Sequence, residues 1–279
     1  EDGHQVSVID NLSTGRLENI ESIKENGNFH YTIGSVLNRE LMEKLMAGID
    51  QVYHLAAAVG VKYIIENPLL SLKTNIVGTD NVLELANKHK AKVLLTSTSE
   101  IYGKSEKVPF SEDDDRLLGS TRISRWGYSD SKAIDEFMAL AYFREKRLPV
   151  VIVRCFNTVG PRQTGQYGMV LPKFIKAALL DQPLVVYGSG KQTRCFADVS
   201  DVVDAFIKLM QTPECQGEIF NVGTTESISI EDLAKKVKAM CGSKSRIDYM
   251  SYEDAFEEGF EDMMNRMPDL GKIKQFIGY

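Results

Sequence analysis

Residues 92–103 read KVLLTSTSEIYG, and this stretch decides the fold class. Its first seven residues, Lys92–Thr98, form an apolar and β-branched run, which predicts a buried strand. A helical pattern precedes it over Pro68–His89, where an Asn-Pro start suits a helix N-terminus, and another follows over Tyr128–Lys146. Strands that alternate with helices in this way predict a parallel sheet with helices on both faces, an α/β fold.

The same alternation continues on both sides of this stretch. Residues 1–157 are expected to form the main domain. Residues 158–279 are expected to form mainly a smaller substrate-binding lobe, with some elements, such as Glu218–Asn221, returning to the main sheet. The further predicted strands are Gln5–Asp10, Gln51–Leu55, Val150–Arg154 and Leu184–Tyr187, and the further predicted helices are Val170–Leu180, Val202–Met210 and Ile230–Met240.

Composition narrows the class of protein. The chain has 279 residues, 43% of them hydrophobic, and a net charge of −6, which argues against nucleic acid as the main partner because phosphate binding favours a basic surface. Its four cysteines show no CxxC spacing, so we expect neither a metal site nor a disulfide framework. With no apolar run near the roughly 18 residues of a membrane span and no signal peptide, a cytoplasmic protein is expected. The acidic run Ser111–Asp115 predicts a solvent-exposed loop.

An acidic residue ends the first predicted strand. In VIDN, residues 8–11, Asp10 stands where dinucleotide-binding units place the acid that bonds the adenosine ribose. Such an acid follows a Gly-rich phosphate loop by roughly 20 residues, which would put that loop before Glu1. We therefore expect the chain to start inside its first βαβ unit, with the first strand and the Gly-rich loop missing. The alternative is that Asp10 is a turn residue and nothing is missing.

The segment GYSDSK, residues 127–132, places Tyr128 and Lys132 four apart on a predicted helix, so that both side chains share one face. An ammonium group near a phenol lowers the pKa of the tyrosine, which makes it a general base for a sugar hydroxyl. By itself this spacing is weak evidence, since a tyrosine beside a solvated lysine is the commoner explanation.

Small and hydroxyl side chains end two other predicted strands. Thr98 and Ser99 end the strand of the opening stretch, and HLAAAVG at residues 54–60 ends another strand in small residues. Ligands of doubly wound sheets bind at the carboxyl ends of strands, so these hydroxyls are expected to face the ligand. Strand capping and core packing explain each feature equally well, but their order along the chain favours a functional site.

Nine segments carry a resemblance to a known family: VIDNLSTG (8–15), HLAA (54–57), NIVGT (75–79), STSEIYG (97–103), YSDSK (128–132), RCFNTVGPR (154–162), LPKFI (171–175), VYGSGKQTRCFADVSD (186–201) and NVG (221–223). On these segments the chain resembles the extended short-chain dehydrogenases/reductases, specifically the nucleotide-sugar epimerases, dehydratases and decarboxylases. The resemblance covers essentially the whole chain and implies a Rossmann-like doubly wound sheet, NAD as cofactor and a UDP-linked sugar as substrate.

The resemblance implies a role for individual residues. The catalytic set would be Thr98, Ser99, Glu100, Tyr128 and Lys132, in which Tyr128 takes the C4 hydroxyl proton. The cofactor would be bound by Asp10, Asn11, Leu55, Ala56, Ala57 and Asn75, together with Tyr128 and Lys132. The substrate and its diphosphate would be bound by Asn157, Arg162, Lys173, Tyr187, Arg194 and Arg266. An acid at position 10 favours NAD over NADP.

Several reactions share transient oxidation at C4 of the sugar. In the 4,6-dehydratases an Asp–Glu pair follows the Thr, and Ser99–Glu100 stands here instead, which counts against that reaction. The residues Thr98 to Glu100 with Arg194 resemble UDP-glucuronate decarboxylases, whereas RWGYSDSK (125–132) looks more like the bacterial and archaeal epimerases. We therefore expect an NAD-dependent 4-epimerase of UDP-glucose/galactose or of a UDP-uronic acid, with UDP-glucuronate decarboxylase as the alternative.

Two expectations concern partners and a different class of protein. The resemblance implies a homodimer built on the helices Pro68–His89 and Tyr128–Lys146. The alternative of another class is a truncated, inactive nucleotide-sugar-binding module, because the phosphate loop is missing. The intact pair of Tyr128 and Lys132 favours the enzyme.

Overall fold

A computed structural model describes residues 3–165, 169–255 and 261–279. Its central sheet has four parallel strands in the order β10-β5-β4-β3. These strands are β3 (Gln51–His54), β4 (Lys92–Thr98), β5 (Val150–Cys155) and β10 (Ile219–Val222). Thr98 and Val222 are both in register with Cys155, so three of the strands end at one edge of the sheet.

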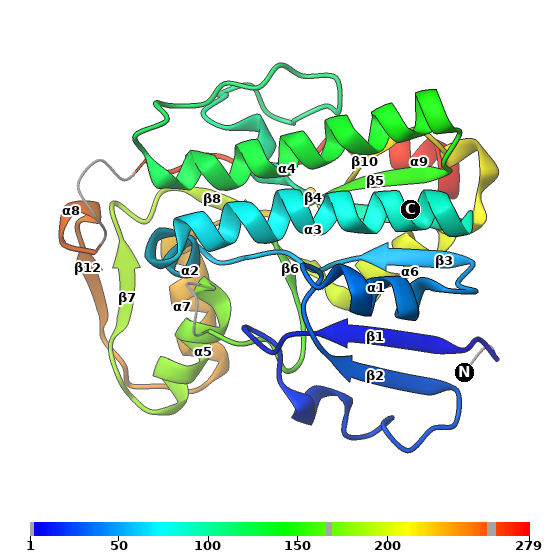
Figure 1. The fold of residues 1–279 in the computed structure, drawn as a ribbon. Helices are drawn as coiled ribbons and strands as arrows, with labels where there is room; N and C mark the ends of the chain where they lie inside the picture. Colours follow the sequence, from blue (N-terminus) through cyan, green and yellow to red (C-terminus); the bar gives the residue numbers. More distant parts are fainter. Residues whose placement is uncertain (1–2, 166–168, 256–260) are drawn as a thin grey trace.

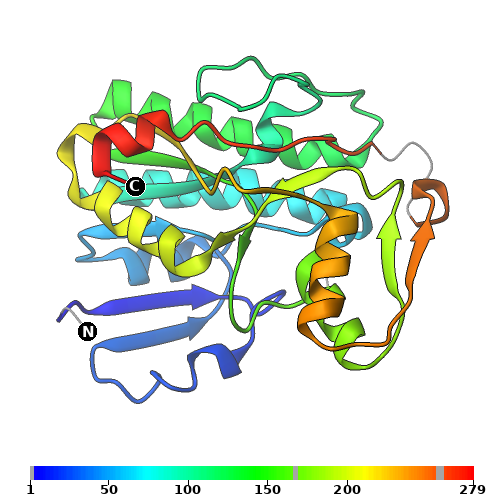
Figure 2. The same ribbon diagram turned by 180° about the vertical axis from the view of Figure 1, so that it is seen from behind.

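Helices cover both faces of this sheet, which confirms the predicted α/β fold with a parallel sheet. The helices α3 (Pro68–His89) and α4 (Ser124–Ala141) lie over one face (Figure 1), and α6 (Val199–Gln211) and α9 (Gly271–Ile277) lie over the other (Figure 2). Strand β4 therefore alternates between two cores, with Val93 and Leu95 in one and Leu94 in the other, all of them 0% exposed. An apolar run buried on both faces is typical of parallel sheets.

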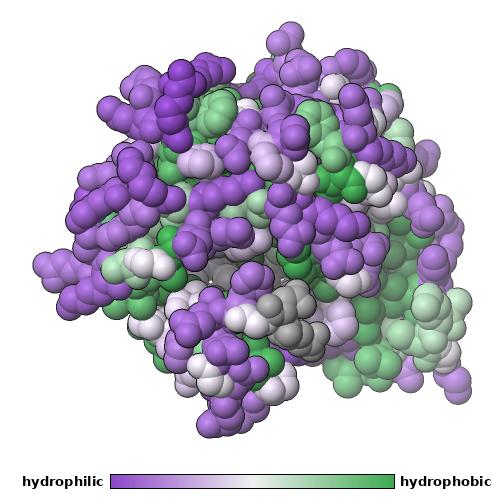
Figure 3. All heavy atoms as spheres, turned by 90° about the vertical axis from the view of Figure 1, so that its right-hand side faces the viewer, coloured by the Kyte–Doolittle hydropathy of each residue, from purple (hydrophilic) through white to green (hydrophobic). Residues whose placement is uncertain are grey.

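Strands β1 (Val6–Asp10) and β2 (Phe29–Ile33) form a separate parallel pair beside the central sheet. Helix α1 (Arg39–Met46) follows them and packs on α3. Among the described residues, no ladder of hydrogen bonds joins β1 to β3. Hydrophobic side chains on this pair stay exposed, such as Val6 at 45% and Ile33 at 58%. The face drawn in Figure 3 is mostly hydrophilic, with hydrophobic residues gathered on one side of it. The expected absence of a strand and a Gly-rich loop stays a prediction.

The second half of the chain builds a core of its own. In it, α5 (Val170–Leu179) and α7 (Ile230–Met240) pack against β7 (Leu184–Tyr187), which pairs with β12 (Ile247–Met250). Strand β10 leaves this half to pair with β5. The division of the chain at residue 157 stays a prediction. The remaining elements are η1 (Leu17–Ile20), α2 (Val61–Glu66), η2 (Ser99–Tyr102), η3 (Tyr142–Lys146), β6 (Thr158–Val159), β8 (Thr193–Cys195), β9 (Ala197–Asp198), η4 (Pro213–Cys215), β11 (Ser227–Ser229) and α8 (Tyr252–Ala255).

The prediction of a solvent-exposed acidic loop is wrong for Glu112. Glu112 is only 9% exposed, and its Oε1 accepts from the Asn221 N–H of β10 at 2.7 Å. The loop carries this carboxylate to a strand that lies more than a hundred residues further along the chain, since the two residues are 109 apart. A run of like charges cannot reveal such a long-range contact.

Candidate active site

Hydroxyl and carboxyl side chains follow the carboxyl end of β4 directly. Thr98 is the last residue of the strand and caps η2, because its hydroxyl accepts from the Glu100 N–H at 3.2 Å. Thr98 and Ser99 are buried, and the Glu100 side chain is 13% exposed. This corner lies at the edge of the sheet where doubly wound folds bind their ligands.

Helix α4 brings Tyr128 to the same corner. Burial raises the pKa of the Tyr128 phenol, the charges of Glu100, Cys155 and Asp135 raise it further, and a hydrogen bond with Thr98 opposes them. These neighbours place the phenol between the ends of β4 and β5. The structure thus brings Thr98 and Tyr128 together, and their catalytic roles stay predictions.

Lys132 lies one turn further along α4 and is buried. Its ammonium donates to Asp135 Oδ2 at 2.8 Å, and the two side chains are 3% and 0% exposed. Burial and the charge of Lys132 lower the pKa of His54 to about 3, while burial raises the pKa of Cys155 to about 12 against the same charge. Both of these groups are therefore neutral at ordinary pH. Burial raises the pKa of Asp135, and the Lys132 ammonium opposes that rise.

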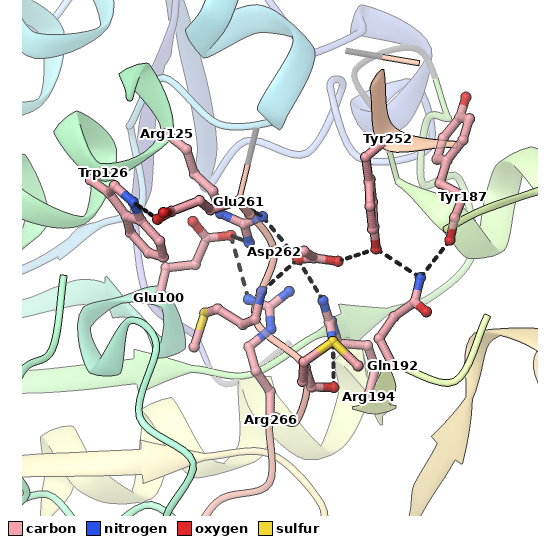
Figure 4. A network of polar contacts seen from close by, with 12 residues as sticks. Glu100, Arg125, Trp126, Tyr187, Gln192, Arg194, Tyr252, Glu261, Asp262 and Arg266 are labelled. Carbon is pink, nitrogen blue, oxygen red and sulfur yellow. Dashed lines mark hydrogen bonds and ion pairs between the residues drawn. The ribbon is translucent and has the colours of Figure 1, made fainter. Parts of the chain in front are cut away.

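Three arginines converge on two carboxylates beside this corner (Figure 4). Arg125 of α4 donates to Asp262 Oδ1 at 2.8 Å and to Glu100 Oε1 at 3.4 Å. Arg194 of β8 donates to the same Asp262 oxygen at 3.0 Å. Arg266 donates to Glu100 Oε1 at 3.4 Å. These five residues are called the arginine cluster below.

Among the residues that the structure describes, three guanidinium groups of the arginine cluster face two carboxylates. Burial pushes the pKa of Asp262 up, but Arg194, Arg125 and Arg266 together lower it to about 2. Burial and the neighbouring arginines lower the pKa of Arg266 to about 10. Its Nε is buried without a hydrogen-bond partner. A cluster with a spare buried guanidinium donor suits an anionic ligand.

Aromatic side chains hold the loop that supplies Asp262. The Trp126 indole of α4 donates to Glu261 Oε2 at 2.8 Å, and the Tyr252 hydroxyl donates to Asp262 Oδ2 at 2.8 Å. Gln192 in turn donates to the Tyr252 hydroxyl at 3.0 Å (Figure 4). The loop is therefore fixed to α4 on one side and to the second half of the chain on the other.

Asp10 ends β1 as expected. Its side chain is exposed, and the backbone of the following residues runs close to its carboxylate. Its Oδ1 accepts from the Leu12 N–H at 2.6 Å, and Asn11 accepts from the Ser13 N–H at 3.0 Å. A Cβ added at Gly15 would come within 2.9 Å of both Asp10 carboxylate oxygens. An exposed acid that the chain approaches so closely fits the recognition of a ribose diol.

The other residues expected to bind the cofactor lie near the end of β3. Leu55, Ala56 and Ala57 follow the strand directly, and Leu55 is 57% exposed. Asn75 is buried: its Oδ1 accepts from the Ala58 N–H at 2.8 Å, and its Nδ2 donates to the Ser131 hydroxyl at 2.9 Å. The amide thus ties the end of β3 to α3 and α4, and its contact with a cofactor stays a prediction.

Four residues expected to bind the substrate lie outside the arginine cluster. Arg162 donates to the Asn19 carbonyl oxygen at 2.7 Å and lines an open cavity of about 540 Å³ beside α5. The Lys173 ammonium lies 5.9 Å from the centre of the Tyr187 ring. The side-chain oxygen of Asn157 is buried without a hydrogen-bond partner. The roles of these four residues stay predictions.

Sequence reasoning missed Arg125, Asp262 and Tyr252. Arg125 is in the segment RWGYSDSK, which shows no more than an arginine before a tryptophan at the start of a helix. Asp262 lies 137 residues from Arg125 in the chain, so no local pattern could connect them. The sequence offered one indication of Asp262: it lies shortly before Arg266, which the resemblance did identify.

The described residues also bear on metal binding and on membrane insertion. Across residues 3–165, 169–255 and 261–279, no group of three or more His, Cys, Asp and Glu side chains could hold a metal ion. The expectation of a metal-free site stays a prediction. In that same described part of the chain, no helix has both the length and the apolar character needed to cross a membrane.

Comparison with known proteins adds three findings. A family model for GDP-mannose 4,6 dehydratase matches residues 1–279. The chain is 43% identical, over 99% of its length and 85% of the relative's, to UDP-N-acetyl-alpha-D-glucosaminuronate decarboxylase of Bacillus cytotoxicus. It is 37% identical over 100% of its length to UDP-glucuronic acid decarboxylase 1 of Xenopus tropicalis, of which it spans only 63%.

One of the similar solved structures holds both a cofactor and a sugar. It is UDP-glucuronic acid 4-epimerase from Bacillus cereus in complex with UDP-glucuronic acid and NAD. The TM-score is 0.87 at 28% identity, and the match covers 99% of this chain and 85% of the other. The likeness extends over the central sheet and the second half of the chain together.

Proposed function

The chain belongs to the GDP-mannose 4,6 dehydratase family, within the extended short-chain dehydrogenases/reductases of Rossmann-like fold, and we propose that it decarboxylates a UDP-linked uronic acid. The observation that carries the proposal is the arginine cluster, in which three guanidinium groups face two described carboxylates, one of which, Glu100, also acts on Tyr128. The two decarboxylase relatives support the same reaction. This reverses the order of preference that the sequence alone suggested, in which 4-epimerase came first.

A UDP-linked uronic acid carries more negative charge than a UDP-linked neutral sugar. Its diphosphate needs cations, and its sugar adds a carboxylate that needs another. Arg266 donates to Ser99 and Glu100 at 3.4 Å each and retains a buried, unbonded Nε. We assign Arg266 to the diphosphate, and Arg194 with Glu100 to the sugar.

The residues present fit NAD as the cofactor. The carboxylate of Asp10 would bond the adenosine ribose, and an acid there disfavours the 2′-phosphate of NADP. Lys132 would bond the nicotinamide ribose from α4. Bound NAD supplies the oxidant for C4 of the sugar and the reductant that restores it.

Tyr128 and Thr98 would handle the protons at C4. Tyr128 takes the proton of the C4 hydroxyl while Thr98 bonds the same oxygen. Oxidation turns C4 into a ketone, and the sugar becomes a β-keto acid because its C6 carboxylate is attached to the neighbouring C5. Such an acid loses CO₂ readily, by cleavage of the C5–C6 bond. The electron pair of that bond moves to the C4 oxygen as an enolate, which the two hydroxyls stabilise. Solvent then supplies a proton to C5, and Tyr128 gives its proton back to the C4 oxygen when C4 is reduced.

Product analysis by NMR tests this proposal. The full-length protein is supplied with NAD and, separately, with UDP-glucuronate, UDP-N-acetylglucosaminuronate and UDP-glucose. We expect CO₂ and a sugar shortened by one carbon from one or both uronates, and nothing from UDP-glucose. Inversion at C4 with the carbon count unchanged would overturn the decarboxylase. Binding of NAD without turnover of any of these sugars would point to another nucleotide sugar, and failure to bind NAD would favour the inactive binding module.

A UDP-uronic acid 4-epimerase is the second candidate. The fold likeness to the Bacillus cereus epimerase favours it, because that structure holds a uronic acid and NAD. Both reactions begin with the same oxidation, and they diverge at the 4-keto acid. An epimerase must keep the carboxylate and turn the sugar over, whereas a decarboxylase must let the C5–C6 bond break.

We also propose that the chain forms a homodimer through α3 and α4, which lie side by side on one face (Figure 1). Large hydrophobic side chains of these helices are exposed, among them Leu69 at 65% and Phe137 at 67%. Light scattering of the full-length protein and of Phe137→Glu tests this. A dimer that the charge dissociates supports the proposal, and a monomer in both cases contradicts it.

A further inference from the structure

Helix α4 carries an acid that the proposed reaction does not use. Asp135 is 0% exposed, and its Oδ2 accepts from the Lys132 ammonium at 2.8 Å. Thr79 of α3 also interacts with this carboxylate, and its hydroxyl is 3.0 Å from His54 Nε2 of β3. Glu136, the next residue of α4, acts on Asp135 by charge repulsion. A buried ion pair is weak evidence for stability, so its position beside the proposed base calls for a functional explanation.

The acidic groups that face Tyr128 come from three elements. Glu100 reaches it from η2, Cys155 from β5 and Asp135 from its own helix, and each acts to raise the pKa of the phenol. Cys155 is uncharged at ordinary pH because burial raises its pKa to about 12. Lys132 shares a face of α4 with Tyr128, four residues away, and Asp135 pairs with its ammonium.

We propose that Asp135 is a positioning residue for Tyr128 and Lys132: it fixes the ammonium in place and neutralises its charge, so that Tyr128 works as a base at a higher pH than it would beside an unpaired lysine. The proposal rests on the proposed function only in taking Tyr128 as the base. It applies equally to a decarboxylase and to an epimerase.

Elementary electrostatics gives the direction of this effect. An unpaired ammonium near a phenol favours the phenolate. An ammonium with a carboxylate at hydrogen-bond distance acts as a dipole, and the two opposite charges largely cancel at Tyr128. The ammonium has three donors, so a bond to Asp135 leaves two that can reach a ribose. Asp135 therefore orients Lys132 without preventing it from binding the cofactor.

The substitution Asp135→Asn tests the proposal, since it keeps the shape and one acceptor oxygen but removes the charge. The Tyr128 titration is followed by NMR of ¹³C-labelled tyrosine in the NAD-bound protein, with the signal assigned by Tyr128→Phe. We expect the midpoint to fall by about one pH unit, and the ascending limb of the pH profile of kcat/KM to move with it. An unchanged midpoint in folded protein would overturn the proposal, since a merely structural acid would not move it.

A matched control comes from the same helix. Asp130 is 47% exposed and pairs with Arg116 at 2.8 Å, so Asp130→Asn also removes one carboxylate from α4. It should leave the Tyr128 midpoint unchanged. An equal shift in this control would mean that the net charge of the helix, and not the pairing of Lys132, sets the titration.

A double variant covers the case in which Asp135→Asn does not fold. Replacing both members of a buried pair by apolar residues is often tolerated, which favours Lys132→Met with Asp135→Leu. The midpoint should stay near that of the parent protein, because two cancelling charges are removed together. A rise of about one pH unit would show an unneutralised Lys132 and would overturn the proposal. No sugar is needed, so the result stands apart from the product analysis.

Discussion

Two buried arginine sites of this protein differ in how completely the chain pairs them. Arg154 donates to both Glu136 oxygens at 3.0 and 2.8 Å, to the Tyr102 hydroxyl at 3.0 Å and to the Glu112 carbonyl oxygen at 2.8 Å. In the arginine cluster, three arginines share two carboxylates, and the contacts to Glu100 are 3.4 Å long. Every guanidinium nitrogen of Arg154 therefore has a protein partner, whereas Arg266 of the cluster has a buried Nε without one.

The largest expected effect comes from breaking the saturated site. Arg154→Met leaves Glu136 buried without its cation, and we expect the free energy of unfolding to fall by about 3–5 kcal/mol. Denaturant unfolding of the variant measures this. Adding Glu136→Leu should restore much of the loss, because no uncompensated charge remains. A loss below about 1 kcal/mol for the single variant would remove the distinction between the two sites.

Removing an arginine from the cluster should lower activity but not stability, which is the opposite of what we expect at Arg154. For Arg266→Met we expect kcat/KM to fall about 100-fold, or about 3 kcal/mol of transition-state stabilisation. The free energy of unfolding should stay level or rise, because the two remaining guanidinium groups still face the two carboxylates. Steady-state kinetics with the uronate and denaturant unfolding check both halves. Arg246→Met is the control, since Arg246 is 77% exposed and pairs with Asp248 away from the cluster. A stability loss as large as that of Arg154→Met would contradict the comparison.

Acid should weaken the arginine cluster in a defined pH window. The pKa of Asp262 is lowered from 3.8 to about 2, so its stabilisation is complete above pH 3.8 and is lost as the pH falls through 2. Asp262→Asn should cost about 2 kcal/mol of unfolding free energy at neutral pH, and this difference should vanish between about pH 4 and pH 2. Unfolding curves of parent and variant over that range measure it. A difference independent of pH would mean that the charge of Asp262 contributes nothing.

The smallest effect is expected at the rim of the cluster. Lys104 pairs with Glu261 at 3.2 Å, and the two side chains are 38% and 32% exposed. Solvent screens such a pair, so Lys104→Ala should change the free energy of unfolding by less than about 1 kcal/mol and leave kcat/KM unchanged. Thermal unfolding and steady-state kinetics check this. A large activity loss would show that the functional cluster extends to Glu261.

The half of the site that depends on one strand and the next helix could be predicted from the sequence. Thr98 ends an apolar strand and Tyr128 lies on the helix that follows, so the alternation of elements brings them to one edge of the sheet. The arginine cluster could be predicted only in part. Arg125 pairs with Asp262, which lies 137 residues further along the chain, so no local sequence pattern connects the two. The same limit applies to Glu112, whose burial depends on a strand 109 residues further along.

The long separations in the arginine cluster have a consequence for how the protein acquires its activity as it folds. Arg266 meets Ser99 across 167 residues, and Trp126 meets Glu261 across 135. Contacts between such distant segments form late, because closing a long loop costs entropy before any contact compensates for it. The sheet and its helices can therefore assemble before the arginine cluster is complete. During refolding, substrate affinity should return after the secondary structure does, so activity reports completion of the whole chain.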